Sequence, residues 1–516
     1  MPIKSPHMAT MCSAAFLSEL QNLLGTAKIA ADVCQTVAGA STMKPLDAAL
    51  RYLASRPQQR SNAGGVTPGD TGDTLNIVFL LFSGYLVFLM QAGFAMLSAG
   101  HVRVKNNSNI LLKNLLDCAI GTMAWYLLGN GLAFGEAGGR ANGFIGTGDF
   151  ALSATDQSTR TQSAYHLFFF HWAFSAAAAT IVAGAVAERI TFLSYGAYSC
   201  IMSGFVYPVA VHWLWTEWGW LSPLAARPLL GSGAVDFAGG VAVHVVGGTA
   251  ALIGTYFLGP RVGRFGIDGE SVRGYRENNS NLVVLGTFLL WFGWYGFNPG
   301  SAAMASNISS AAIVSRTAVT TTLGAGAGGI SAMLLTFAIT RKYDVMSLCN
   351  GVLCGLVAVT PGCGVIDVWA GILVAFLGAG TFMAVDALML RARLDDVVAA
   401  VPLHLGCGVV GTLFVGLFAR EEYVLEFYGS PANAGRRWGA FFGGDGRLLA
   451  CQLIALLAAA SWVAAIFVPF FWAMRRFKLI RVPVEQEISG LDASRYSLLT
   501  TNELPTMGAP QRKSYM

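Results

Sequence analysis

The sequence predicts an all-α protein that crosses a membrane many times. Hydrophobic residues make up 54% of the 516 positions and charged residues only 12%, about half the share found in ordinary soluble domains. Glycine occurs 61 times, as expected where small residues let membrane helices approach closely. Apolar segments of membrane-spanning length follow one another along most of the chain. A soluble fold would need far more charge to cover its surface.

Eleven segments are predicted to cross the membrane, because a span needs about 20 mostly apolar residues. The eighth is short and could be broken. Residues 1–73 form a polar N-terminal tail, 74–474 the transmembrane domain and 475–516 a polar C-terminal tail. The eleven segments are about 75–99, 111–135, 166–187, 192–215, 236–259, 281–304, 315–340, 345–360, 364–390, 396–419 and 449–474.

Lysine and arginine in the loops set the predicted orientation, since cytoplasmic loops are the more basic ones. One side carries the larger share, including Arg475, Arg476 and Lys478 directly after the last segment. That side is therefore expected to be cytoplasmic. With eleven spans, the N-terminus then lies outside, extracellular or lumenal, and the C-terminus lies in the cytoplasm.

A spacing that occurs twice indicates internal duplication. Asp236 precedes His244 by eight positions and Asp396 precedes His404 by eight, and a glycine follows each histidine four positions later. Spans one to five and six to ten would form two inverted repeats, with the eleventh helix outside the symmetry and the working site where the repeats meet. Ionisable side chains within spans mark function by default. The alternative is two unrelated histidines in helix packing.

Aromatic residues gather in the third, fourth and sixth spans, among them Phe174, Trp215 and Phe297. An aromatic face attracts a small cation by about 0.5–2 kcal/mol. A belt of tryptophans at the membrane interface is the other explanation. Pro299 removes a backbone donor from the sixth span, so that a nearby carbonyl or the Ser301 hydroxyl could face a lumen.

Several function classes have no support in the sequence. No nucleophile elbow, HExxH motif or phosphate loop occurs, so no enzyme activity is expected. The nine cysteines show no zinc-binding spacing, and neither a metal nor a cofactor is expected. Without a basic, aromatic stripe, nucleic acid is not an expected partner.

Five ordered strings carry a family resemblance: Gln91–Leu97, Ala187–Arg189, Asp236–Gly240 running to His244, Gly286–Ser301, and His404 with Gly406–Gly408. With these strings the chain resembles the ammonium transporters (Amt/Mep/Rh), and most closely their plant-type branch, over about residues 74–497. The resemblance implies a homotrimer with one pore per subunit.

The resemblance also implies roles for individual residues at an outer substrate-binding site. Trp215 would roof that site, and Ser301 would accept a hydrogen bond from ammonium. Phe174 would belong to the site and, together with Phe297, form a stacked gate above the pore. Asp236 would hold the geometry of the site.

Deeper in the pore, His244 and His404 match the twin histidines of the family. Thr360 resembles a threonine near the outer vestibule, and Trp294 within the sixth-span string is a further candidate. His171 departs from the pattern, because relatives usually have glutamine there. This histidine could alter the outer site or add a pH-sensitive group.

The implied function is ammonium transport in a lipid bilayer, expected to be the plasma membrane. Ammonium or methylammonium would be recruited outside and deprotonated, and ammonia would pass the histidines with co-transfer of the proton. The cytoplasmic tail resembles a regulatory tail, in which a kinase would phosphorylate Ser494. One alternative is an ammonium sensor, which would carry a fused signalling domain or lack intact pore residues. The other is a Rhesus-type channel for neutral ammonia, which would lack the Trp215 and Ser301 pair.

Overall fold

The computed structural model describes residues 68–136, 142–155, 164–266, 278–429 and 437–495. The chain divides into two units, and the second, Gly72–Met516, holds nearly all of these residues. The expected N-terminal tail lies almost entirely outside them. Within the described ranges the secondary structure is helical, with a single isolated bridge between Ile190 and Arg481.

Nine helical segments of the described residues are long and apolar enough to cross a membrane. Some of them join two or three elements. They are α5 (Pro68–His101); α6 (Asn107–Ala124) with η2 (Trp125–Gly129) and α7 (Asn130–Phe134); α8 (Tyr165–Ala185); η6 (Gly240–Val245) with α11 (Val246–Leu258); α12 (Ser280–Phe297) with η8 (Pro299–Ala302); α13 (Ile308–Thr340); α15 (Val368–Arg391); η9 (Val401–Gly406) with α16 (Cys407–Phe418); and α18 (Arg447–Arg476).

The two remaining predicted spans are helical as well. The fourth is a continuous run of α9 (Phe192–Ile201), η4 (Met202–Val206) and α10 (Tyr207–Trp215). The eighth is α14 (Val345–Val359), which has only 15 residues. The shorter elements are η1 (Val104–Asn106), η3 (Phe150–Leu152), η5 (Leu229–Gly231), α17 (Glu421–Tyr428), η10 (Ala440–Phe442), α19 (Val484–Ser489) and α20 (Leu491–Arg495).

The first helix begins earlier than the predicted boundary at residue 74. The sequence Pro68-Gly69-Asp70 was expected to belong to the tail, but α5 already starts at Pro68. Proline is tolerated in the first turn of a helix, where its missing N–H has no partner to lose. Pro68 is therefore compatible with the start of a helix.

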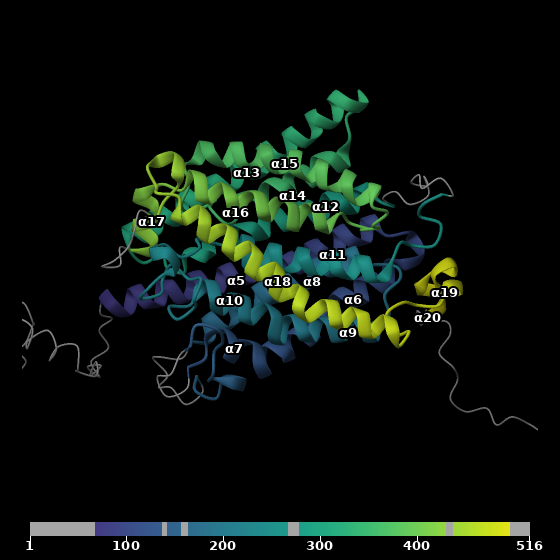
Figure 1. Ribbon diagram of the computed structural model, residues 1–516, viewed down its shortest axis with the longest axis horizontal. Helices are drawn as coiled ribbons and strands as arrows, with labels where there is room; N and C mark the ends of the chain where they lie inside the picture. Colours follow the sequence, from purple (N-terminus) through teal and green to yellow (C-terminus); the bar gives the residue numbers. More distant parts are fainter. Residues whose placement is uncertain (1–67, 137–141, 156–163, 267–277, 430–436, 496–516) are drawn as a thin grey trace, which may run out of the picture. The chain divides into compact units, whose positions relative to one another are not determined.

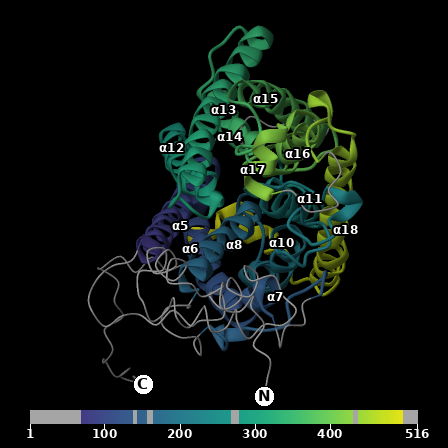
Figure 2. The ribbon, with the colours of Figure 1, turned by 90° about the vertical axis from the view of Figure 1, so that its left-hand side faces the viewer.

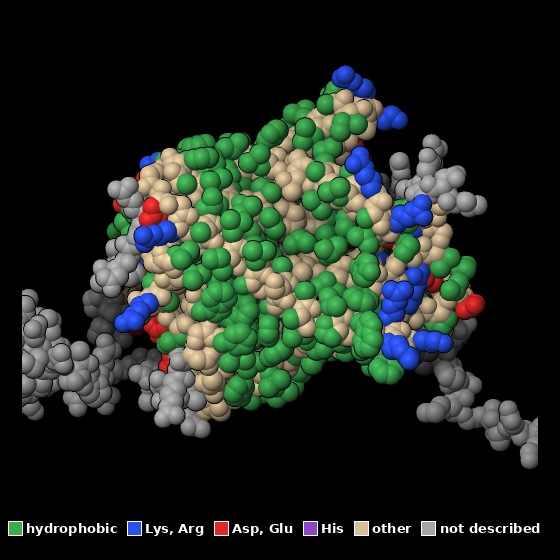
Figure 3. Space-filling view, viewed as in Figure 1, with side chains coloured by type: hydrophobic (Ala, Val, Ile, Leu, Met, Phe, Trp, Pro, Cys, Tyr) green, Lys and Arg blue, Asp and Glu red, His purple; other side chains and the backbone are tan. Residues whose placement is uncertain are grey.

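The crossing helices lie side by side, with α13, α14 and α15 packed together (Figures 1 and 2). Glycines allow the closest of these approaches: a Cβ at Gly355 would lie 2.0 Å from the carbonyl oxygen of Gly324. Figure 3 shows hydrophobic side chains over the middle of the visible face and Lys and Arg side chains gathered at the end where α19 and α20 lie. Such an apolar band matches a lipid surface.

Two π-helical turns, η6 and η9, repeat the same local structure. One carboxylate oxygen of Asp236 accepts hydrogen bonds from the backbone N–H groups of Val241 and Ala242, and one of Asp396 accepts from that of Val401. The residues before the turns have a left-handed backbone, with φ of 101° at Gly239 and 56° at Ala399. The two turns pack against each other. The sequence repeat therefore corresponds to a repeated structure.

Candidate functional site

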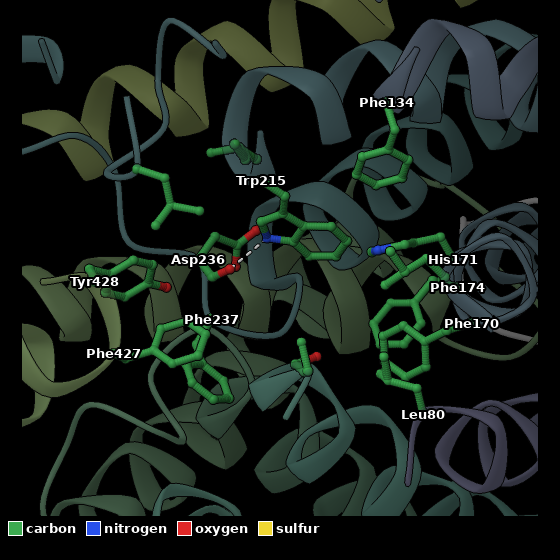
Figure 4. Close-up of a pocket in the computed structure, with 15 residues that line it drawn as sticks. Leu80, Phe134, Phe170, His171, Phe174, Trp215, Asp236, Phe237, Phe427 and Tyr428 are labelled. Atoms are coloured by element: carbon green, nitrogen blue, oxygen red, sulfur yellow. Dashed lines mark hydrogen bonds between the residues drawn. The ribbon is translucent and has the colours of Figure 1, made fainter. Parts of the chain in front are cut away.

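A cavity of about 180 Å³ brings the predicted outer-site residues together (Figure 4). Trp215, Ser301, Phe174, Asp236 and His171 all line it. They come from α8, the C-terminal end of α10, the loop before η6, and η8. His171 and Phe174 share one face of α8, since residues three apart in a helix are neighbours. The lining is mostly aromatic, with few polar groups.

Asp236 fixes Trp215 through its backbone. The indole Nε1 of Trp215 donates a hydrogen bond to the backbone oxygen of Asp236 at 2.7 Å, drawn as a dashed line in Figure 4. The carboxylate of Asp236 caps η6 instead, and its Oδ1 is buried with no hydrogen-bond partner among the described residues. This residue therefore holds the indole and the first histidine-bearing turn in one arrangement.

Ser301 presents its lone pairs to the cavity because its proton is used elsewhere. Helix α12 ends at Phe297, and Pro299 begins the short turn η8 that carries Ser301. The Ser301 hydroxyl donates to the backbone oxygen of Phe297 at 2.8 Å. A hydroxyl has one donor and two acceptor lone pairs. The Ser301 oxygen is thus left to accept a hydrogen bond.

Two phenylalanines close the bottom of the cavity. The rings of Phe174 and Phe297 stack with centroids 4.1 Å apart and planes 21° apart. The edge of Phe174 also meets Trp215, with centroids 5.9 Å apart. Both phenylalanine side chains are completely buried. An ion in the cavity would meet a closed apolar layer here.

The histidines follow directly after this layer. His244 stacks on Phe297 with ring centroids 5.7 Å apart, and on His404 with centroids 5.2 Å apart. The Nδ1 atoms of the two histidines are 3.1 Å apart, a hydrogen-bonding distance. The Nε2 of His244 is buried without a partner in the described structure, which leaves one ring nitrogen able to bond a passing molecule.

Trp294 and Thr360 support this pair from the side. Trp294 stacks on His244 with centroids 5.6 Å apart, and its Nε1 donates to the Thr360 hydroxyl at 3.0 Å. Thr360 in turn is 2.7 Å from the backbone oxygen of Leu356. Thr360 does not line the outer cavity. Its contacts are those of a residue that positions Trp294.

A glycine allows the two histidine-bearing segments to touch. A Cβ at Gly248 would lie 2.4 Å from the backbone nitrogen of Leu405, which is too close for any side chain. Gly248 is the glycine four positions after His244. The glycine in the repeated spacing is therefore required by the approach of the backbones.

Comparison with known proteins decides the family. The sequence model of the Ammonium Transporter Family matches residues 78–501. The chain belongs to the ammonium transporter family. It is similar to Ammonium transporter 1 member 3 of Solanum lycopersicum, with 44% identity over 82% of this chain and 92% of that protein. Ammonium transporter 1 member 1 of Oryza sativa subsp. japonica is 46% identical over 83% of this chain and 86% of its own length. These plant relatives support the plant-type branch.

Solved structures agree with this family. A structure described as a Sensor Amt Protein has a TM-score of 0.73 and 30% identity, covering 83% of this chain and 100% of that chain. Candida albicans Mep2 has a TM-score of 0.70 and 27% identity, covering 82% of this ammonium transporter family member and 89% of the Mep2 chain. The chain is thus an integral membrane protein of a transporter family, and not an enzyme.

Sequence reasoning missed several residues that line the outer cavity. Phe170 lies one helical turn before Phe174, and the two rings contact each other with centroids 4.8 Å apart and planes 46° apart, so helical spacing could have found it. Phe427 and Tyr428 come from α17, beyond the tenth span. Phe134 comes from α7. No local pattern in the sequence indicates that these last three face the cavity.

A buried network of charges lies in the loops at the helix ends away from the outer cavity. Arg261 bonds Asp395 at 2.8 Å and Glu188 at 2.8 Å, and Arg103 also pairs with Glu188. Burial alone would raise the pKa of Asp395, but the hydrogen bonds and charge of Arg261 and the charge of Arg189 hold that pKa well below its usual range. The loops after spans one, three, five and nine are thereby tied together.

The C-terminal tail is bound to this end. Asp492 of α20 accepts hydrogen bonds from the backbone N–H groups of Ser108 and Asn109, at 3.0 and 2.8 Å. An acidic cap at this position satisfies the free donors at the start of α6. Glu487 of α19 accepts from the Val262 N–H at 2.7 Å and pairs with Arg481. Ser494 lies on α20, but its side chain is outside the described part of the structure.

Proposed function

We propose that this chain transports ammonium by deprotonating it at the outer cavity and passing ammonia along His244 and His404. One observation carries the proposal: a single series of contacts runs from Trp215 through the Phe174–Phe297 stack to the histidine pair. Each member of the series suits one step of the transfer.

The outer cavity is suited to bind ammonium in its charged form. Ammonium has four N–H donors and a positive charge, and the cavity offers the Ser301 lone pairs and the faces of Trp215 and Phe174. A cation over an aromatic face gains about 0.5–2 kcal/mol. The unpartnered Oδ1 of Asp236 adds negative charge beside the indole. These groups together would favour ammonium over neutral ammonia at the entrance.

Deprotonation follows from the apolar layer below. Moving an ammonium-sized ion from water into a low-dielectric interior costs of the order of 20 kcal/mol in the idealised limit. A buried ion therefore sheds its proton rather than enter. Ammonia can then cross the Phe174–Phe297 stack as a neutral molecule and hydrogen-bond the imidazoles. The proton, taken up first by water in the outer cavity, would be co-transferred either separately from ammonia or through the histidine pair.

The same scheme rejects potassium. Potassium has no proton to lose, so it would have to cross the apolar layer as a charged ion. It also has no N–H to donate to Ser301 or to an imidazole. Selectivity for ammonium over potassium would thus depend on the ability to donate hydrogen bonds and to lose a proton, and not on the size of the ion.

The wider architecture is proposed from the same fold. Eleven helices cross the membrane as two inverted five-helix repeats plus α18, and three subunits associate, each with its own pore. The basic end near α19 and α20 lies in the cytoplasm, with the N-terminus outside. The plasma membrane is the proposed location.

The tail is proposed to regulate the pore. Phosphate on Ser494 would add a charge of about −1.5 to −2 two positions after Asp492, which caps α6. That charge would oppose the packed contact between α20 and the start of α6. A kinase acting on Ser494 would then undock the tail and close the pores.

Uptake of methylammonium in cells that lack their own ammonium transporters tests the function. The wild-type chain should support uptake, and Trp215→Ala should reduce it without reducing the amount of protein at the cell surface. If the wild-type chain reached the surface and supported no uptake, a sensor would replace the transporter. Ammonium uptake without any ammonium-evoked current would favour a channel for neutral ammonia.

A further inference from the structure

His171 occupies the wall between two cavities. On one side is the outer cavity with Trp215 and Ser301. On the other is a side cavity of about 390 Å³, whose polar lining comes from Asn130, Asp149 and Thr155. The imidazole is thus the ionisable group common to the linings of both cavities.

The imidazole has no hydrogen-bond partner among the described residues. Its Nδ1 is buried and unsatisfied. The ring is held by packing alone, with centroids 4.3 Å from Phe134, 5.5 Å from Phe170 and 6.0 Å from Trp215. Buried polar groups are normally bonded, so a ring fixed in this way is available to a ligand.

The side chain points into the outer cavity. Figure 4 shows a ring nitrogen of His171 directed towards Trp215, with Asp236 on the far side of the indole. A cation under Trp215 would therefore have Ser301 and His171 as separate acceptors. The Ser301 hydroxyl is already committed as a donor to Phe297, and a neutral imidazole offers one lone pair.

We propose that His171 is a ligand of the recruited cation. This inference rests on the proposed transport function. A neutral ring accepts one N–H of ammonium or methylammonium. Loss of this acceptor weakens recruitment and leaves the conducting path unchanged.

The other ionisable groups around the ring have fixed roles. Asp149 accepts hydrogen bonds from Ala154, Thr155 and Asn130, which hold it in place at the side cavity. Asp236 and Tyr428 line the outer cavity, and the Asp236 carboxylate caps η6. His171 has a buried ring nitrogen without a hydrogen-bond partner among the described residues, so this nitrogen can accept a hydrogen bond from the cation.

The test measures the KM and the maximal rate of methylammonium uptake at neutral pH, where methylammonium is almost fully protonated. His171→Leu should raise the KM about tenfold, which corresponds to the loss of one hydrogen bond to a charged group. The maximal rate should change little. His171→Gln, which keeps an acceptor, should retain a KM near that of the wild type.

A matched control lies on the same helix. His166 lines neither cavity, so His166→Leu should keep the wild-type KM. The inference is overturned if His171→Leu has the wild-type KM, or if His171→Gln raises the KM as much as His171→Leu does. In either case wild-type uptake would leave the proposed transport intact. Absence of wild-type uptake would instead remove the transport function and this inference with it.

Discussion

The Nδ1 atoms of His244 and His404 lie 3.1 Å apart although the residues are 160 positions apart in the chain. At this distance the N–H of one ring donates a hydrogen bond and the lone pair of the other ring accepts it. Each ring stands on a π-helical turn that an aspartate caps at the same offset. Each histidine therefore stands on its own copy of one local structure, and the two rings meet where the two copies are in contact.

Removing one ring should disable the pair. His404→Ala leaves Nδ1 of His244 buried without its partner, which costs about 1–3 kcal/mol, and methylammonium uptake should fall at least about tenfold. Uptake is measured at equal amounts of surface protein. A rate equal to that of the wild type would show that the rings take no part in conduction.

Separating the two turns should have a similar effect without touching a histidine. Gly248→Ala places a Cβ 2.4 Å from the Leu405 nitrogen, so the backbones must move apart. Gly326→Ala is the matched control, because a Cβ there meets no atom within 4 Å. Uptake should be lost in the first variant and kept in the second. Equal uptake by both would mean that close contact of the turns is unnecessary.

Ser301→Ala should weaken recruitment rather than conduction. The variant removes the acceptor lone pairs from the cavity and leaves the Phe174–Phe297 stack in place. A hydrogen bond to a charged group is worth about 1.5–3 kcal/mol, so the KM for methylammonium should rise about tenfold or more. The maximal rate should change little. A lower maximal rate at an unchanged KM would contradict this assignment.

The buried charge network should stabilise the protein at neutral pH and lose this effect in acid. The folded pKa of Asp395 lies below its unfolded value of about 3.9, so its stabilisation is full above that value and is lost as the pH falls below it. Asp395→Asn should lower the unfolding temperature in detergent, since breaking a buried ion pair costs about 3–5 kcal/mol.

The difference between Asp395→Asn and the wild type provides the pH test. It should be constant from about pH 5 to 8 and shrink below about pH 4, where the Asp395 carboxyl of the unfolded wild-type chain takes up a proton while that of the folded chain does not. Thermal unfolding followed by intrinsic fluorescence measures it. A difference that grew on acidification would have the wrong sign.

Charge at Ser494 should close the pore. Ser494→Asp should reduce uptake and Ser494→Ala should retain it, because the new charge opposes the docking of α20 against α6. Asp492→Ala, which removes the cap itself, should resemble Ser494→Asp. Equal uptake by the two Ser494 variants would exclude this form of regulation.

Much of this arrangement could be predicted from the sequence, because it depends on local patterns. The apolar segments predicted the helices, and the repeated spacing of Asp, His and Gly predicted that His244 and His404 meet. The expected start of the first helix was wrong, because Pro68 begins α5 rather than ending the tail. Local sequence does not distinguish these two uses of proline.

The remaining features depend on contacts between distant segments. Phe427 and Tyr428 reach the cavity from α17, and Asp492 reaches α6 from a position 383 residues away in the chain. The π-helical form of η6 and η9 follows from a carboxylate cap and close packing together. None of these has a periodic signal, so each needed the folded structure.

The central claim is that the nitrogen crosses without its extra proton, and ion selectivity tests it most directly. Purified wild-type protein in planar bilayers or liposomes should carry an ammonium-evoked current or flux and none with potassium at the same concentration. His404→Ala should abolish the ammonium signal. A potassium current comparable to the ammonium current would mean that ions cross intact, and deprotonation at the Phe174–Phe297 stack would be refuted.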